Sequence, residues 1–194
     1  MKNIVVRVAI EEDGQFAKII TDEMEAAAII RGSGISKRSP ASIIKKINEG
    51  KAVIAVTNNN VWVGFSYIEV WGNGEFVSNS GLIVAPAYRG NGVAKLIKEK
   101  IFELSKSLYP GAKIFSITTG LAIMKMNAGL GFEPVTFSEV AKDKDFWMGC
   151  KSCVNHAILK SKHCKNCLCT AMLYTPAAKS KEKRTRVTGP LSSK

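Results

Sequence analysis

The residues from Val84 to Ala94 have the types and spacing of an anion-binding loop. An apolar strand ends at Pro86, and a glycine-bearing turn leads into an amphipathic helix. Such a turn presents unpaired backbone N–H groups and the positive end of a helix to a phosphate or pyrophosphate. Gly90 and Gly92 carry no side chain that would hold a ligand away from the backbone. An ordinary strand-to-helix turn is the alternative interpretation.

All five cysteines lie within residues 150–169, where they form two C-x-x-C pairs followed by Cys169. Two such pairs close in sequence are typical of a structural zinc site. The predicted ligands are Cys150, Cys153, Cys164 and Cys167. Four thiolates would leave no open position for catalysis. The alternative is that these cysteines are small buried apolar residues and members of a last strand.

Polar residues inside two apolar strands are candidates for catalysis. Glu69 is a carboxylate among apolar neighbours, which makes it a candidate general base. An exposed position on an alternating strand explains Glu69 equally well. Asn79 lies on the strand that enters the glycine loop, where its amide could position an acceptor or could be ordinary edge polarity.

Basic residues gather in a loop that is rich in glycine and serine. Arg31, Lys37 and Arg38 lie there, and arginine is well suited to bidentate capture of a carboxylate. These residues are therefore candidates for binding an acidic substrate. A solvated basic loop is the alternative.

Hydrophobic periodicity and turn residues predict the elements that position these side chains. The expected order is a strand at 3–9, a helix from about 11 to near 32, a helix at 39–49, strands at 52–57, 61–70 and 75–84, a helix at 91–108, a strand at 113–118, a short helix at 121–130, and strands at 134–140 and 167–174. The short connections between the middle three strands indicate an antiparallel meander. The whole pattern predicts a single mixed α/β domain.

The chain has 194 residues, 46% of them hydrophobic, and a net charge of +12. Residues 175–194 carry +5 of that charge and have almost nothing to bury, so we expect a disordered basic tail. No apolar run approaches the roughly 18 residues that span a bilayer. The sequence therefore predicts a cytoplasmic protein without a membrane partner.

Two motifs resemble landmarks of the GCN5-related N-acetyltransferase (GNAT) superfamily. Arg89-x-x-Gly92-x-Ala94 is similar to the acyl-CoA pyrophosphate loop of that family, and Gly131-Phe132 is similar to its second landmark. The resemblance implies the GNAT fold, a mixed α+β fold in which helices flank a central, mostly antiparallel sheet. It implies an acetyltransferase domain at 1–174, with a cysteine-rich insertion at about 141–169.

The resemblance also implies acetyl-CoA as cosubstrate and gives roles to particular residues. The loop residues Arg89, Gly90, Asn91, Gly92, Val93 and Ala94 would hold the pyrophosphate. The strand residues Leu82, Ile83 and Val84 would bind the pantetheine arm, with an N–H of Leu82 or Ile83 polarising the thioester carbonyl. Asn127 would contact the cofactor at the position where many members carry a tyrosine that acts as the general acid. Asparagine cannot act as that acid, so the proton would come from water or another group.

The reaction implied by the resemblance is direct attack of an amine on the acetyl thioester. In this fold the first two helices wall the acceptor site, which would bring Arg31, Lys37 and Arg38 to the acceptor. The whole chain, including residues 32–40, residues 118–122 and the cysteine-bearing end, also resembles a small group of bacterial GNAT proteins linked to arginine biosynthesis as presumed N-acetylglutamate synthases. This resemblance implies the α-amine of glutamate as acceptor.

Two alternatives stay open at this point. One is acetylation of a protein N-terminus or lysine. The other is a non-catalytic, zinc-stabilised module that binds nucleic acid, but the sequence has no basic patch with interleaved aromatic residues, which counts against it. A homodimer is an open alternative to a monomer.

Overall fold

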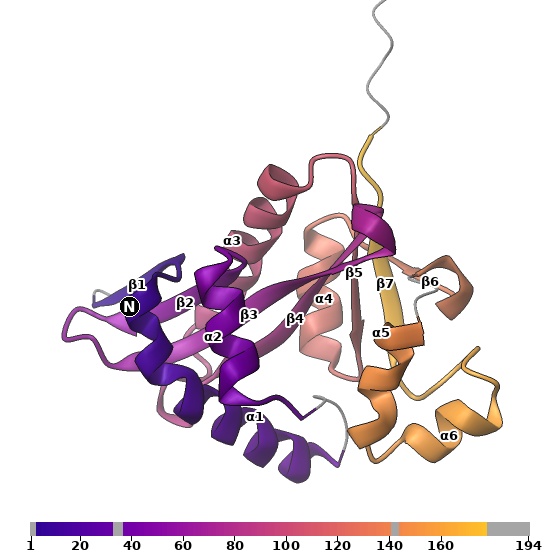
Figure 1. The fold of residues 1–194 in the computed structure, drawn as a ribbon, viewed down its shortest axis with the longest axis horizontal. Coiled ribbons are helices and arrows are strands. Elements are labelled where there is room, and N and C mark those ends of the chain that lie inside the picture. Colours follow the sequence, from indigo (N-terminus) through magenta and orange to yellow (C-terminus); the bar gives the residue numbers. More distant parts are fainter. Residues whose placement is uncertain (1–2, 33–36, 141–143, 178–194) are drawn as a thin grey trace, which may run out of the picture.

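The computed structural model describes residues 3–32, 37–140 and 144–177. Most of the predicted tail at 175–194 and the start of the predicted insertion at 141–143 lie outside these residues. Within the described residues, seven strands form one sheet in the order β1-β2-β3-β4-β5-β7-β6, with helices on both faces (Figure 1). The strands are β1 (Ile4–Val8), β2 (Ala52–Thr57), β3 (Trp62–Trp71), β4 (Phe76–Val84), β5 (Lys113–Thr118), β6 (Glu133–Val135) and β7 (Thr170–Tyr174).

The helices divide between the two faces of the sheet. They are α1 (Ala17–Arg31), α2 (Pro40–Asn48), α3 (Val93–Leu108), α4 (Leu121–Gly129), α5 (Lys144–Met148) and α6 (His156–Ser161). α1 and α2 bury one face of β2 and β3, whereas α3 packs against the other face, where α4 joins it. α5 and α6 cover β5 and β7 and are drawn in orange beside α1 in Figure 1.

The predicted meander is present. β2, β3 and β4 pair in antiparallel order through short connections. The second helix begins as predicted, because Ser39 Oγ accepts a hydrogen bond from Ser42 N at 3.2 Å and Pro40 occupies the first turn.

Three element boundaries differ from the sequence predictions by three residues or more. A 3-10 turn at Glu11–Phe16 precedes the first helix, and the last strand begins at Thr170. The strand predicted at 134–140 is only β6, followed by a 3-10 turn at Phe137–Glu139. This strand is short because Pro134 lacks a ladder donor and the Glu139 carboxylate accepts from Thr136 N at 2.9 Å, which caps the turn.

The sheet opens between its two central strands. β4 and β5 pair in parallel through Phe76–Ser78 and Lys113–Phe115 only. From residue 79 onward, β4 has no partner on the β5 side among the described strands. The fold therefore leaves backbone groups of β4 facing a gap.

Among the described residues, no helix has the length and apolar character that crossing a membrane requires.

Candidate active site

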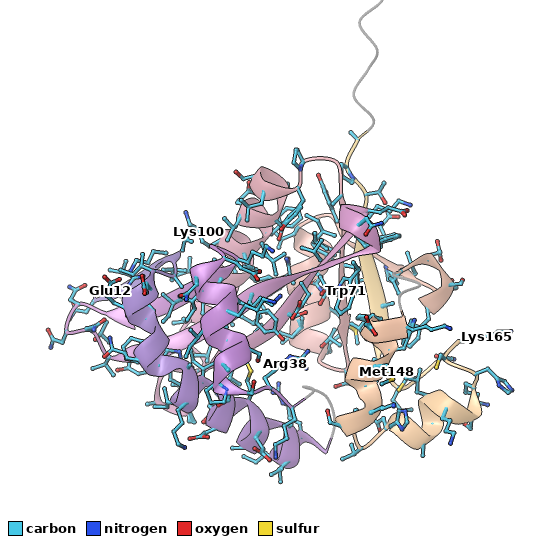
Figure 2. All side chains as sticks on the ribbon, in the orientation of Figure 1. Glu12, Arg38, Trp71, Lys100, Met148 and Lys165 are labelled. Carbon is cyan, nitrogen blue, oxygen red and sulfur yellow. The ribbon has the colours of Figure 1, made fainter. Side chains whose placement is uncertain are left out.

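A cavity of about 240 Å³ lies over this gap, between the α1–α2 side and the segment that carries the cysteines. We call it the central cavity; its walls include Arg38, Tyr67, Ser80, Leu82, Thr118 and Trp147. In Figure 2, the labelled Arg38 and Trp71 lie between α2 and α5, over the middle of the sheet. Three parts of the chain that are distant in sequence thus meet at one site.

A β-bulge shapes the floor of the central cavity. Tyr67 pairs with Ser80 whereas Phe65 pairs with Ile83, so β4 has an extra residue here. Gly81 takes a φ of +64° at the bulge, a conformation that costs other residues strain. The bulge lies where β4 loses its second neighbour.

The bulge also decides which backbone groups face the gap. Ala85 N donates to Val63 O at 2.8 Å, and Phe65 pairs with Ile83, so Ile83 and Ala85 bond to β3. Because successive residues of a strand direct their N–H and C=O groups to opposite sides, those of Leu82 and Val84 face the gap. Of the two predicted oxyanion donors, the geometry therefore favours Leu82 over Ile83.

The predicted pyrophosphate loop has the geometry of an anion cradle. Gly90 and Gly92 have φ values of +78° and +74°, and Gly92 is the N-cap of α3. The N–H groups of residues 90–94 have no hydrogen-bond partner within the described part of the chain. Five unpaired donors at the start of a 16-residue helix are suited to a phosphate group.

The Arg89 side chain links this loop to β4 and α1. Its Nε donates to Val84 O at 2.9 Å, and its Nη2 pairs with Glu23 of α1. Burial together with the nearby charge of Arg89 lowers the pKa of Arg31. Two guanidinium groups thus add positive potential between the loop and the central cavity.

The basic residues predicted to bind the acceptor separate into two groups. Arg31 and Arg38 line the central cavity. Lys37 does not, because its Nζ pairs with Glu25 at 2.8 Å, an interaction that raises the pKa of Lys37. Glu69, the predicted base, is also outside the cavity lining, and its carboxylate pairs with Lys46 at 2.7 Å.

The two predicted asparagines differ in their placement. Asn79 lines the central cavity, but its Nδ2 donates to Ser105 Oγ at 2.7 Å and its Oδ1 accepts from Lys98 Nζ at 3.3 Å. Asn127 is fully buried, and its Nδ2 lies 3.6 Å from Met172 Sδ. Asn79 therefore lies at the cavity with its amide bonded to two side chains of α3, whereas Asn127 lies outside the cavity lining.

The predicted zinc site is not formed. Among the described residues, which include all five cysteines, no group of three or more His, Cys, Asp or Glu side chains is arranged to hold a metal ion. Cys164 is exposed, whereas Cys153 Sγ accepts from Asn155 N at 3.4 Å. Burial, together with the neighbouring cysteine thiols, raises the pKa of Cys150 to about 11 and that of Cys169 to about 12. Cys150, Cys153, Cys167 and Cys169 instead line the central cavity.

The sequence predictions missed Tyr67 and Ser78, whose hydroxyls lie with that of Ser80 on the cavity floor. The hydroxyl oxygen of Tyr67 accepts a hydrogen bond from Arg38 Nε. Trp71 Nε1 donates to Ser78 Oγ at 3.0 Å, and Ser78 Oγ lies 3.0 Å from Ser80 Oγ. The available signal was alternation, because Tyr67 shares a strand face with Glu69 in an otherwise apolar run.

Replacing Gly81 with alanine is expected to destabilise the fold. The φ of +64° alone costs about 1–3 kcal/mol, and the added Cβ would overlap the Tyr67 ring. Urea unfolding measures the loss. Gly50→Ala is the matched control, because Gly50 has a φ of +66° but open space around it. Equal losses in the two variants would show that the contact with Tyr67 contributes nothing.

Comparison with known proteins relates this geometry to a family. Residues 20–123 match the family model described as the acetyltransferase (GNAT) family. Histidine N-acetyltransferase from Xenopus tropicalis is 30% identical over 112 residues, which are 55% of this chain and 35% of that protein. The chain therefore spans about a third of the length of this relative.

Solved structures share the fold at low sequence identity. N-acetylglutamate synthase from Neisseria gonorrhoeae, complexed with coenzyme A and N-acetylglutamate, has a TM-score of 0.62 and 14% identity over 90% of this chain and 35% of that chain. A phosphinothricin acetyltransferase from Sinorhizobium meliloti, in complex with acetyl-CoA, has a TM-score of 0.60 and 15% identity over 96% and 97% of the two chains. The predicted fold class, a mostly antiparallel sheet flanked by helices, is confirmed.

Proposed function

The chain belongs to the acetyltransferase (GNAT) family, and we propose that it transfers an acetyl group from acetyl-CoA to the amine of a small anionic acceptor. Acetyl-CoA supplies the thioester carbonyl carbon that the amine attacks. The residues of this chain bind the cofactor, orient both reactants and exclude water from the cavity.

The fit to the cofactor rests on two features of the backbone. The unpaired N–H groups of residues 90–94 are suited to the pyrophosphate, and Gly90 and Gly92 leave room for its close approach. The open side of β4 presents the peptide groups of Leu82 and the N–H of Val84 to the amides of a pantetheine arm, because Val84 O already accepts from Arg89. A carbonyl oxygen beside the Leu82 N–H would be stabilised as it gains negative charge.

The charge of the central cavity carries the proposal of an anionic acceptor. Arg31 and Arg38 line it, whereas its lining among the described residues contains no aspartate or glutamate. Arg38 uses Nε for Tyr67 and Nη1 for Lys37 O at 3.3 Å, which leaves its Nη2 to bind a carboxylate. The same positive lining disfavours a basic peptide, so acetylation of protein lysines is the weaker candidate.

The size of the cavity favours a single small molecule. About 240 Å³ is below the roughly 300–1,000 Å³ of pockets that take drug-sized ligands. A free amino acid has both the amine to be acetylated and a carboxylate for Arg38. Glutamate is our first candidate, because of the sequence resemblance and because the structurally similar Neisseria enzyme is an N-acetylglutamate synthase.

An acceptor panel tests this proposal. Purified protein is incubated with acetyl-CoA and glutamate, aspartate, glutamine, histidine, lysine or a short peptide, and the N-acetylated product is measured by mass spectrometry. We expect kcat/KM to be highest for glutamate and lowest for lysine and the peptide. Preference for lysine or the peptide would contradict the anionic acceptor, and absence of both turnover and coenzyme A binding would contradict the enzyme.

A further inference from the structure

We propose that Tyr67 is the acid that protonates the departing thiolate of coenzyme A, with Arg38 as its charge partner. This inference rests on the proposed function, because it names a catalytic residue of that reaction. It addresses a requirement that neither the sequence motifs nor the family match assigns to a residue of this chain.

The reaction needs a proton at sulfur. Attack of the neutral amine forms the new C–N bond, and collapse of the tetrahedral intermediate breaks the C–S bond and leaves a thiolate. The thiolate takes one proton, and the amine nitrogen loses one. Asn127 supplies none, because an amide is no acid and this side chain is fully buried.

Tyr67 lies at the place where this proton is needed. Its ring is in the wall of the central cavity together with Gly81 and Leu82. The ring lies so close to the bulge that a Cβ on Gly81 would overlap Cε1 and Cδ1 of Tyr67. Leu82, whose N–H is the candidate oxyanion donor, is the next residue along the chain. A thioester seated at Leu82 would thus share the cavity wall with the Tyr67 ring.

The hydrogen bond from Arg38 leaves the phenolic proton available. A guanidinium group only donates, so in the Arg38–Tyr67 contact the phenol oxygen must be the acceptor. Among the described residues, the phenol O–H has no acceptor of its own. Its proton is therefore free to be donated to a group inside the cavity.

The groups around Tyr67 favour a phenol that donates its proton and takes one up again in each turnover. Burial raises the pKa of Tyr67, with a smaller rise from Glu69, so the phenol stays protonated near neutral pH. Arg38 acts in the opposite sense and would stabilise the phenolate once the proton has moved. Across the cavity lie Arg31, His156 and the thiols of Cys150, Cys153, Cys167 and Cys169. The proton that leaves the amine nitrogen restores the phenol, so protons balance over one turnover.

The variant Tyr67→Phe removes the hydroxyl and keeps the ring against Gly81. We expect kcat to fall by about 100-fold, the scale of general acid catalysis, and the KM for acetyl-CoA to stay within about 3-fold of wild type. The alkaline limb of the kcat–pH profile should disappear in this variant, because the ionising phenol is gone. Titration calorimetry with coenzyme A shows that the variant is folded.

Tyr174→Phe is the matched control. Tyr174 is a half-buried tyrosine of β7 that packs against Phe102 and lies outside the cavity lining. The control should keep the wild-type kcat and pH profile. A Tyr67→Phe variant with wild-type kcat, or one that changes only the acceptor KM, would overturn the inference while an active wild-type enzyme still supports the proposed function.

Discussion

Replacing Lys98 with methionine is expected to stabilise the fold by about 2–4 kcal/mol at pH 6. Lys98 lies on α3, is 2% exposed, and has a pKa that burial lowers to about 7. The difference from the ordinary lysine value of 10.5 corresponds to about 5 kcal/mol of destabilisation when the amine must be charged. Methionine removes that cost but leaves Asn79 Oδ1 without its hydrogen-bond donor. The unpaired oxygen destabilises the variant by about 1–3 kcal/mol, so the net gain is about 2–4 kcal/mol.

The sign of the pH dependence follows from the same values. Between pH 7 and 10.5 the unfolded lysine holds a proton that the folded lysine has released. Since the unfolded state binds more protons there, the free energy of unfolding of the wild type rises with pH across this window. The destabilisation is complete below pH 7 and absent above 10.5. Lys98→Met should lack this rise, so its advantage shrinks as pH increases and reverses above pH 10.5, where only the about 1–3 kcal/mol for the unpaired Asn79 Oδ1 remains.

Urea unfolding of both proteins at several pH values measures this effect. Lys100→Met is the matched control, because Lys100 is on the same helix and exposed (Figure 2). We expect the control to change the free energy of unfolding by less than about 0.5 kcal/mol, as is usual for surface substitutions. A Lys98→Met variant that is less stable than wild type at pH 6 would show that the amine contributes net stability.

Lys98 also illustrates where periodicity alone misassigns a helix face. The hydrophobic pattern predicts an amphipathic helix with an apolar stripe for α3, and Ile97 and Ile101 are indeed fully buried. The buried face is wider than that stripe. Lys98 lies 4.9 Å from the centre of the Phe132 ring, and Ser105 is buried with it. The hydrophobic pattern could not reveal this, because Phe132 comes from a distant part of the chain.

Some features of the candidate site depend on residues that are neighbours in sequence, and others depend on contacts between distant parts of the chain. The loop at 89–94 was predictable, because its strand, glycines and helix are contiguous in sequence. The pairing of Arg38 with Tyr67 was not, since it depends on how α2 packs over β3. The cysteines were recognisable as a motif, but their spacing did not reveal that four of them line the central cavity. That placement depends on the cysteine-bearing segment packing against the cluster that contains Phe115 of β5 and Ala171 of β7.

Replacing Gly92 with valine is expected to weaken acetyl-CoA binding by at least about 100-fold. Gly92 has a φ of +74° at the start of α3, and a β-branched residue in that region pays about 1–3 kcal/mol of strain. The loop can relieve this strain only by rotating its peptide groups, which turns the N–H groups of residues 90–94 away from a common point. Hydrogen bonds to a charged group are worth about 1.5–3 kcal/mol each, so the misalignment of two accounts for the loss.

A graded series at this position separates backbone conformation from side-chain bulk. Asparagine tolerates positive φ better than alanine, and alanine better than valine, so the dissociation constant for coenzyme A should increase in the order Gly, Asn, Ala, Val. Titration calorimetry measures it. Gly111→Val is the control, since Gly111 has open space around it and no positive φ. If asparagine, which is larger than alanine, bound more weakly than alanine, bulk near the phosphate and not backbone conformation would account for the presence of glycine.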